Sequence, residues 1–150
     1  GRGIRAAAEP ATHNFDPVTL RSRWSHKSVA VVAGLGSFGL HQMVITEAGC
    51  AGRFGSLVLE ARLPAGVWTG QKVAPVVRRE RCLYFHDGSC LECVARCPVT
   101  ALAPGAPLDK QACHAWLHHT AERYQEIGLA DVCGKCAVGP CSFESAVPRS

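Results

Sequence analysis

Eight of the nine cysteines in this 150-residue sequence form a regular pattern in its second half. The pattern consists of two sets of four. Each set has one separate cysteine, one C-x2-C pair and one cysteine next to a proline. In chain order the eight are Cys82, Cys90, Cys93, Cys97, Cys113, Cys133, Cys136 and Cys141. The thiolates of a C-x2-C loop can reach neighbouring irons of a cubane cluster while backbone N–H groups stabilise the sulfides. The pattern therefore predicts two [4Fe–4S] clusters and electron transfer.

The distribution of these ligands between the two clusters has two solutions. In two-cluster ferredoxins the cysteine of the C-P pair binds the other cluster. By that rule one cluster takes Cys82, Cys90, Cys93 and Cys141, and the other takes Cys97, Cys113, Cys133 and Cys136. The sequence departs from the compact C-x2-C-x2-C-x3-C-P run, because its first cysteine comes from further upstream. An unswapped set of Cys82, Cys90, Cys93 and Cys97 therefore stays open.

Cysteine and histidine side chains can also serve roles other than binding an iron–sulfur cluster. Structural zinc uses C-x2-C pairs but needs only four of the eight ligands, and an odd number of cysteines does not suit a disulfide framework. The ninth cysteine, Cys50, lies outside the pattern and is expected to be an ordinary buried thiol. His114, His118 and His119 share a predicted helix with Cys113. We expect solvation or packing for them, not metal binding.

A glycine-rich motif, G-x-G-x-x-G, is formed by Gly34, Gly36 and Gly39. A strand is predicted before it and a helix after it, and a second predicted strand reaches Glu60, as in a dinucleotide-binding fingerprint. The chain has no room for further βαβ units before the cysteines begin at Cys82. The motif thus predicts either a packing turn or, as an alternative function, a dinucleotide-binding redox protein.

The apolar patterning predicts an α+β fold. The β-branched run 28–33 predicts a buried strand that ends at the glycine motif, and a helix is expected over 38–48. Alternation over 57–63 predicts a half-buried strand, and residues 64–80 are expected to form a loop. Together these elements would make a small strand–helix–strand layer.

A longer helix is predicted within the cysteine segment, over 109–127, with Asp109 as its N-cap and Gly128 as its C-terminal stop. We therefore expect three parts: a lead-in segment (1–28), a partial α/β layer (29–80) and an irregular two-cluster ferredoxin-type module (81–150).

Composition argues against several classes of protein. The formal net charge is only +4, so no nucleic-acid partner is expected. No apolar run reaches the roughly 20 residues of a membrane-spanning helix, and no secretory signal is recognisable, so we expect a cytoplasmic protein without a membrane partner. Because the first residue is Gly1, the chain is expected to be processed, trimmed or cut from a longer one. The basic run 78–81 is a candidate docking surface for an acidic electron donor.

These motifs resemble the C-terminal half of the epoxyqueuosine reductases, whose cluster layout is shared by related iron–sulfur proteins such as the reductive dehalogenases. The resemblance covers roughly residues 28–142. It rests on the A-G-L-G-S-F-G block from Ala33, the V-I-T block from Val44, the R-F-G-S-L-V-L-E block from Arg53 and the cysteine pattern. The Ser37-Phe38 pair and the G-P-C-S sequence at the last cysteine depart from the reductases, so their tRNA substrate is not implied.

The resemblance implies that the chain is the electron-input part of a cobalamin-type oxidoreductase, in which two clusters pass electrons one at a time to cobalt. Gly34, Gly36 and Gly39 would line a corrinoid pocket or its supporting turn. The family's N-terminal half, which carries the acidic catalytic residue, has no counterpart in these 150 residues. A small donor protein such as a flavodoxin or ferredoxin is the expected partner. A stand-alone ferredoxin-like carrier is the alternative.

Overall fold

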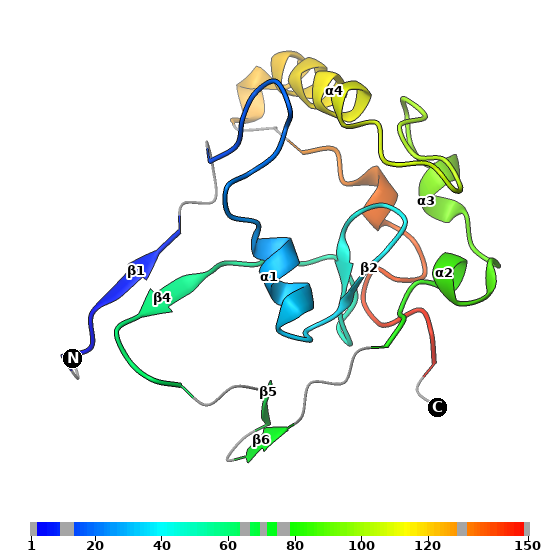
Figure 1. Ribbon diagram of the computed structural model, residues 1–150. Coiled ribbons are helices and arrows are strands. Elements are labelled where there is room, and N and C mark those ends of the chain that lie inside the picture. Colours follow the sequence, from blue (N-terminus) through cyan, green and yellow to red (C-terminus); the bar gives the residue numbers. More distant parts are fainter. Residues whose placement is uncertain are drawn as a thin grey trace.

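In the part of the chain that the structure describes, the fold combines short helices with three separate two-stranded antiparallel sheets, which confirms the predicted α+β class (Figure 1). The computed structural model describes residues 3–9, 14–63, 67–69, 72–74, 79–128 and 132–148. Within these residues, no helix combines the length and the apolar character needed to cross a bilayer.

The three sheets are small and lie apart from one another. They pair β1 (Ala6–Ala8) with β4 (Leu57–Leu59), β2 (Ser37–Phe38) with β3 (Val44–Ile45), and β5 (Val67–Thr69) with β6 (Lys72–Ala74). The β1–β4 ribbon places Ala7 opposite Val58 and lies at the edge of the molecule near the N-terminus (Figure 1). It joins the expected lead-in segment to the part of the chain that follows it.

The strand predicted over 28–33 is wrong, because this run belongs to helix α1 (His26–Val32). The side chain of Ser25 caps the helix by accepting a hydrogen bond from the backbone N–H of Ser28 at 3.2 Å. Gly34, at φ 76°, follows the last turn in the left-handed conformation that commonly ends a helix. The two end signals outweigh the strand preference of the β-branched residues between them.

The helix predicted over 38–48 is also wrong, and the hairpin β2–β3 replaces it. The backbone N–H of Gly39 donates to the carbonyl of Met43 at 2.9 Å, and Gln42 adopts φ 60° in the turn. The apolar residues that follow are β-branched, which favours a strand. The expected strand–helix–strand layer is therefore a helix followed by a hairpin.

The predictions for residues 57–63 and 64–80 are confirmed in part. The strand predicted over 57–63 is present only as β4, and the side chains of Leu57 and Val58 are exposed. The loop expected over 64–80 contains the β5–β6 hairpin. Its residues 64–66, 70, 71 and 75–78 lie outside the described part of the chain.

The cysteine-rich half is built from short helices joined by loops. They are α2 (Leu83–Asp87), α3 (Glu92–Ala95), α4 (Lys110–Arg123), η1 (Gln125–Ile127) and η2 (Lys135–Ala137). The helix predicted over 109–127 is confirmed as α4 followed by η1. Asp109 caps α4 by accepting a hydrogen bond from the backbone N–H of Ala112 at 2.9 Å, and Gly128 ends η1.

The apolar core is small and centred on β3. Its largest fully buried side chains are Val44 and Ile45, and α1 packs against this strand. Within the described residues, the buried hydrophobic side chains are those of Ala30, Leu40, Val44, Ile45, Cys50, Ala101, Leu102 and Val147. Helices α2, α3 and α4 bury no side chain fully. These three helices of the cysteine-rich half therefore contribute no side chain to the apolar core.

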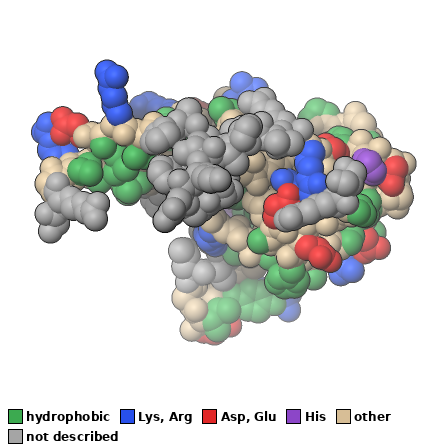
Figure 2. All heavy atoms as spheres, turned by 90° about the horizontal axis from the view of Figure 1, so that it is seen from below, with side chains coloured by type: hydrophobic (Ala, Val, Ile, Leu, Met, Phe, Trp, Pro, Cys, Tyr) green, Lys and Arg blue, Asp and Glu red, His purple; other side chains and the backbone are tan. Residues whose placement is uncertain are grey.

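Among the described residues on the face shown in Figure 2, charges of both signs are interspersed. In the predicted basic run, Arg79 and Arg81 both pair with the carboxylate of Glu47, while Arg78 lies outside the described residues. Arg81 is buried, so it is not available as a surface charge. The described part of this run is therefore less suited to docking an acidic donor than its sequence indicates.

Candidate metal centre

All nine cysteines are free thiols. Cys82, the first cysteine of the pattern, lies at a turn whose backbone is held by hydrogen bonds. Cys82 is the N-cap residue of α2. One carboxylate oxygen of Glu80 accepts hydrogen bonds from the backbone N–H groups of Arg81 and Cys82, both at 2.7 Å. Gly88 ends α2 at φ 78° and leads the chain into the C-x2-C loop. The glutamate and the glycine thus fix the path of the chain between the first two candidate ligands.

One group of thiols surrounds a small cavity between the helices. The cavity is lined by Cys82, Cys90, Cys93, Cys136 and Cys141, together with His41. Burial, as the largest cause, and the neighbouring thiolate charges of Cys82 and Cys90 together raise the pKa of the Cys93 thiol to about 11. These cysteines are therefore close enough to interact electrostatically.

A second group of thiols gathers around the first turn of α4. Burial raises the pKa of Cys113, and the thiolate charges of Cys97 and Cys133 add to this effect. Burial also raises the pKa of Cys136, with Cys113 as the next largest cause. The sulfur of Cys97 accepts a hydrogen bond from the backbone N–H of Ala101 at 3.2 Å.

Helix α3, which carries Cys93, packs against η2, which carries Cys136. This contact brings the two C-x2-C loops together and explains why Cys136 borders the first group while it interacts with the second. Cys97 lies with Cys113 and Cys136. The arrangement is compatible with metal binding and favours the swapped distribution of ligands, which stays a prediction.

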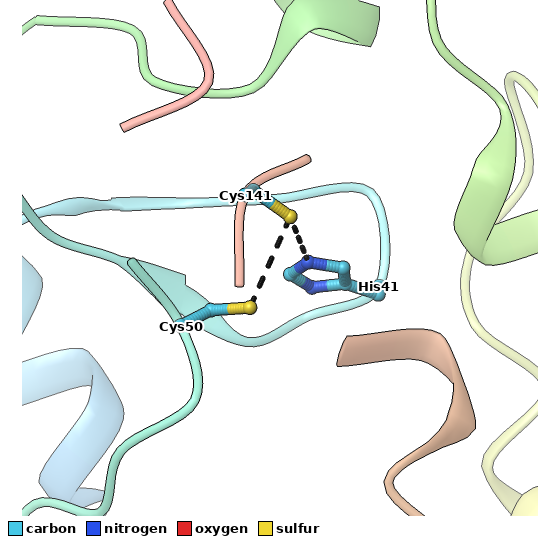
Figure 3. A group of neighbouring side chains, drawn as sticks. All are labelled: His41, Cys50 and Cys141. Carbon is cyan, nitrogen blue, oxygen red and sulfur yellow. Dashed lines mark hydrogen bonds between the residues drawn. The ribbon is translucent and has the colours of Figure 1, made fainter. Parts of the chain in front are cut away.

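The last patterned cysteine also belongs to a group that the sequence did not indicate: His41, Cys50 and Cys141 (Figure 3). Their potential ligand atoms all lie within 4.8 Å of one another, which is compatible with binding a metal ion. Nε2 of His41 is 3.3 Å from Sγ of Cys141, and Sγ of Cys50 is 3.9 Å from the same sulfur. Cys50 is buried, as expected, but it lies beside a candidate ligand.

The protonation of the Cys50 and Cys141 thiols should differ between the metal-free and the metal-bound protein. In the metal-free protein, the hydrogen bond to Cys141 lowers the pKa of Cys50. The same bond, followed by burial, raises the pKa of Cys141 to about 12, and His41 opposes this rise. Cys141 therefore keeps its proton without metal. A bound metal ion would remove that proton, because a coordinating thiol is deprotonated.

The glycine motif lies beside this group, and none of its three glycines lines the cavity between the thiols. A Cβ atom at Gly36 would overlap the backbone of Ile45, and one at Gly39 would come within 2.7 Å of the His41 ring. The order of elements around the motif is helix, turn and strand, the reverse of a dinucleotide-binding unit. Glu60, the candidate ribose ligand, pairs with Arg5 at the surface. The geometry therefore supports the packing role.

An open hollow of about 730 Å³ lies on the other side of Cys50. Lys27 and Arg53 are charged residues of its lining, Trp24 and Phe54 are aromatic, and no carboxylate lines it among the described residues. Because Cys50 borders this hollow and also contacts Cys141, a molecule bound here would lie one side chain away from the first thiol group.

The histidines of α4 make ring contacts. His114 packs edge-to-face against Phe15 and His118, and Trp116 contacts His119. The expected packing role is thus supported.

No protein-family model, curated protein or solved structure matches this chain. The resemblance to the epoxyqueuosine reductases stays a prediction from the sequence motifs.

Proposed function

We propose that this chain binds two [4Fe–4S] clusters and transfers electrons through them. The observation that carries the proposal is the separation of the patterned thiols into two adjoining groups. One cluster, which we call cluster one, would be held by Cys82, Cys90, Cys93 and Cys141. The other, cluster two, would be held by Cys97, Cys113, Cys133 and Cys136.

The spacing of the thiols argues against a single zinc ion held within either proposed set. Four cysteines around one zinc ion have sulfurs about 4 Å apart, because each lies about 2.3 Å from the metal. In a cubane cluster each thiolate binds a different iron, so the sulfurs lie farther apart. Within the described residues, neither proposed set supplies three ligand atoms within 4.8 Å of one another; the group at Cys141 that does so includes His41 and Cys50.

The small apolar core supports the same proposal. Because α2, α3 and α4 bury no side chain fully, the cysteine-rich half needs another source of cohesion. Metal ligation can supply it, since the free energy of binding becomes free energy of folding when the site forms only in the folded chain. Removal of metal should therefore loosen this half of the protein.

The residues around the thiols would support electron transfer by stabilising the negative charge on the ligand sulfurs. When bound, each cluster accepts or releases one electron, and hydrogen bonds to its sulfurs help to set its potential. The backbone N–H of Ala101 donates to Cys97 and would stabilise that thiolate. Half-burial of Cys93 and Cys141 limits the access of water.

The wider role is proposed from the sequence motifs. The chain would be the electron-input part of an oxidoreductase related to the epoxyqueuosine reductases, with a small flavodoxin or ferredoxin as donor. The expected corrinoid site finds less support. Gly36 packs against β3 and Gly39 packs against His41, so these contacts occupy the space that a ligand would need. The hollow beside Cys50 is the better location for an electron acceptor.

The decisive experiment is metal analysis of protein purified without oxygen. About eight irons and eight sulfides per chain, with a broad absorption band near 400 nm that is bleached by dithionite, is the expected result. Zinc without iron would overturn the proposal and leave a structural metal site.

A second experiment separates the enzyme part from the stand-alone carrier. Cluster-loaded protein is titrated with hydroxocobalamin, and binding is followed by equilibrium dialysis. Binding would support the cobalamin-type enzyme, whereas clusters without any corrinoid binding would support the carrier.

A further inference from the structure

The imidazole ring of His41 is held in one orientation. The side chain is buried, with 5% of its surface exposed. Its Nδ1 atom accepts a hydrogen bond from the backbone N–H of Met43 at 3.0 Å. The absence of a side chain at Gly39 leaves room for the ring, because a Cβ atom there would lie 2.7 Å from Cε1 of His41. The β2–β3 turn thus sets which ring atom faces Cys141.

This orientation decides what His41 can offer to the metal centre. A neutral imidazole carries one proton, and Nδ1 cannot hold it because that atom already accepts from Met43. The proton therefore lies on Nε2, which is 3.3 Å from Sγ of Cys141. To bind a metal through Nε2, the ring would need its proton on Nδ1, where it would oppose the N–H of Met43. His41 is accordingly a hydrogen-bond donor to sulfur and not a ligand.

We propose that His41 is a positioning residue for cluster one: its Nε2–H donates a hydrogen bond to the Cys141 sulfur and makes this cluster easier to reduce. The inference rests on the proposed function, since it assigns a role to His41 only when Cys141 binds a cluster.

The backbone holds the donor and the sulfur together. The backbone N–H of Cys50 donates to the carbonyl of Cys141 at 2.9 Å, and that of Ala51 donates to Ser142, also at 2.9 Å. These bonds join the segment around Cys141 and Ser142, which we call the C-terminal ligand segment, to the chain that continues from β3. The distance between His41 and Cys141 therefore does not depend on the metal alone.

The direction of the effect follows from charge. Reduction adds an electron to a cluster that already carries four thiolates, and a donor to one sulfur stabilises the added negative charge. Loss of the donor should shift the potential of that cluster to more negative values. Cluster two, which does not use Cys141, should be unaffected.

The test is a redox titration of both clusters, followed by EPR, in three variants. His41→Phe keeps a ring but removes the donor, and His41→Gln keeps a donor group. His86→Phe, at an exposed position on α2, is the matched control. We expect His41→Phe to shift one cluster to lower potential, His41→Gln to shift it less, and His86→Phe to leave both clusters unchanged. Unshifted potentials in His41→Phe, with about eight irons retained, would overturn the inference.

A measurement on the unmutated protein covers the case in which His41→Phe loses its cluster. Protein labelled with ¹⁵N-histidine is reduced and examined by electron spin echo envelope modulation. A weak coupling from one nitrogen, absent in labelled His41→Gln, is expected for a hydrogen-bonded ring. A much stronger coupling would show direct ligation, and no coupling would show no contact; either result overturns the inference. Absence of any cluster signal in the unmutated protein would instead refute the proposed function.

Discussion

The sulfurs of Cys50 and Cys141 lie 3.9 Å apart, although 91 positions separate the two residues in the sequence. The contact is anchored by a backbone hydrogen bond between the same two residues and by the carbonyl of Ser142, which accepts from Cys50 and Ala51. It joins the last cysteine of the pattern to the best-packed part of the fold. The apolar core around β3 and the metal centre are therefore expected to fold together.

Replacing Cys50 with serine tests whether the ninth thiol is a ligand. Because Cys50 lies outside both proposed sets, Cys50→Ser should keep about eight irons per chain. The buried hydroxyl should lower the free energy of unfolding by about 1–2 kcal/mol. Iron analysis and denaturant unfolding check the two effects. A loss of iron would mean that Cys50 binds metal.

Serine variants of the patterned cysteines test how the ligands are distributed. Each of Cys82→Ser, Cys97→Ser and Cys113→Ser should lose about four irons, because each removes one ligand from one cluster. In the swapped distribution, Cys97→Ser and Cys113→Ser should lose the same EPR signal, and Cys82→Ser should lose the other.

The unswapped distribution makes the opposite prediction for one variant, since Cys97→Ser would then lose the same signal as Cys82→Ser. Full iron content in Cys97→Ser would contradict both distributions. Cys50→Ser is the control in each measurement, because it also replaces a thiol in the same region of the protein.

Spacing rules could identify the candidate ligands because adjacent cysteines stay close in any fold. The helix from Asp109 was likewise predictable, since its cap and its apolar spacing are local signals. The pairing of Cys50 with Cys141 was not, because it depends on tertiary contacts between distant segments. His41 carried no signal at all, as its role depends on which ring nitrogen faces Met43.

The two wrong elements have a common cause. In α1 the β-branched residues give a strand signal, while Ser25 and Gly34 supply the start and stop signals of a helix. In the β2–β3 hairpin, Gly39 and Gln42 mark a tight turn within a stretch that was expected to be helical. Residues at the ends of short elements were therefore more informative than the apolar pattern inside them.

The helix cap at Asp109 should affect cluster two in particular, because Cys113 lies in the first turn of α4. Asp109→Ala removes the acceptor for the backbone N–H of Ala112 and should destabilise the protein by about 1 kcal/mol. Iron release during mild urea treatment should become faster, with the EPR signal of cluster two lost first. Glu122→Ala, at an exposed position near the end of α4, is the control and should leave the release rate unchanged.

The raised thiol pKa values predict how the stability of the metal-free protein depends on pH. Burial and the neighbouring thiolate charges raise the pKa of Cys93 from 9.0 to about 11, so the folded chain keeps a proton that the unfolded chain releases. The contribution of Cys93 to the free energy of unfolding should therefore be constant below about pH 9 and fall as the pH rises towards 11. Urea unfolding at several pH values checks this slope. Cys93→Ala should reduce it, and an unchanged slope would show that other groups cause it.

Gly49 should be essential for joining the hairpin to the C-terminal ligand segment. It adopts φ 78°, and a Cβ atom there would overlap the backbone of Ser142. Gly49→Ala should therefore lower the free energy of unfolding by roughly 2–4 kcal/mol and weaken the retention of cluster one. Gly55→Ala is the matched control, because its Cβ atom would meet nothing within 4 Å. If chemical unfolding and iron retention were the same in both variants, the contact between Cys50 and Cys141 would not support the metal centre.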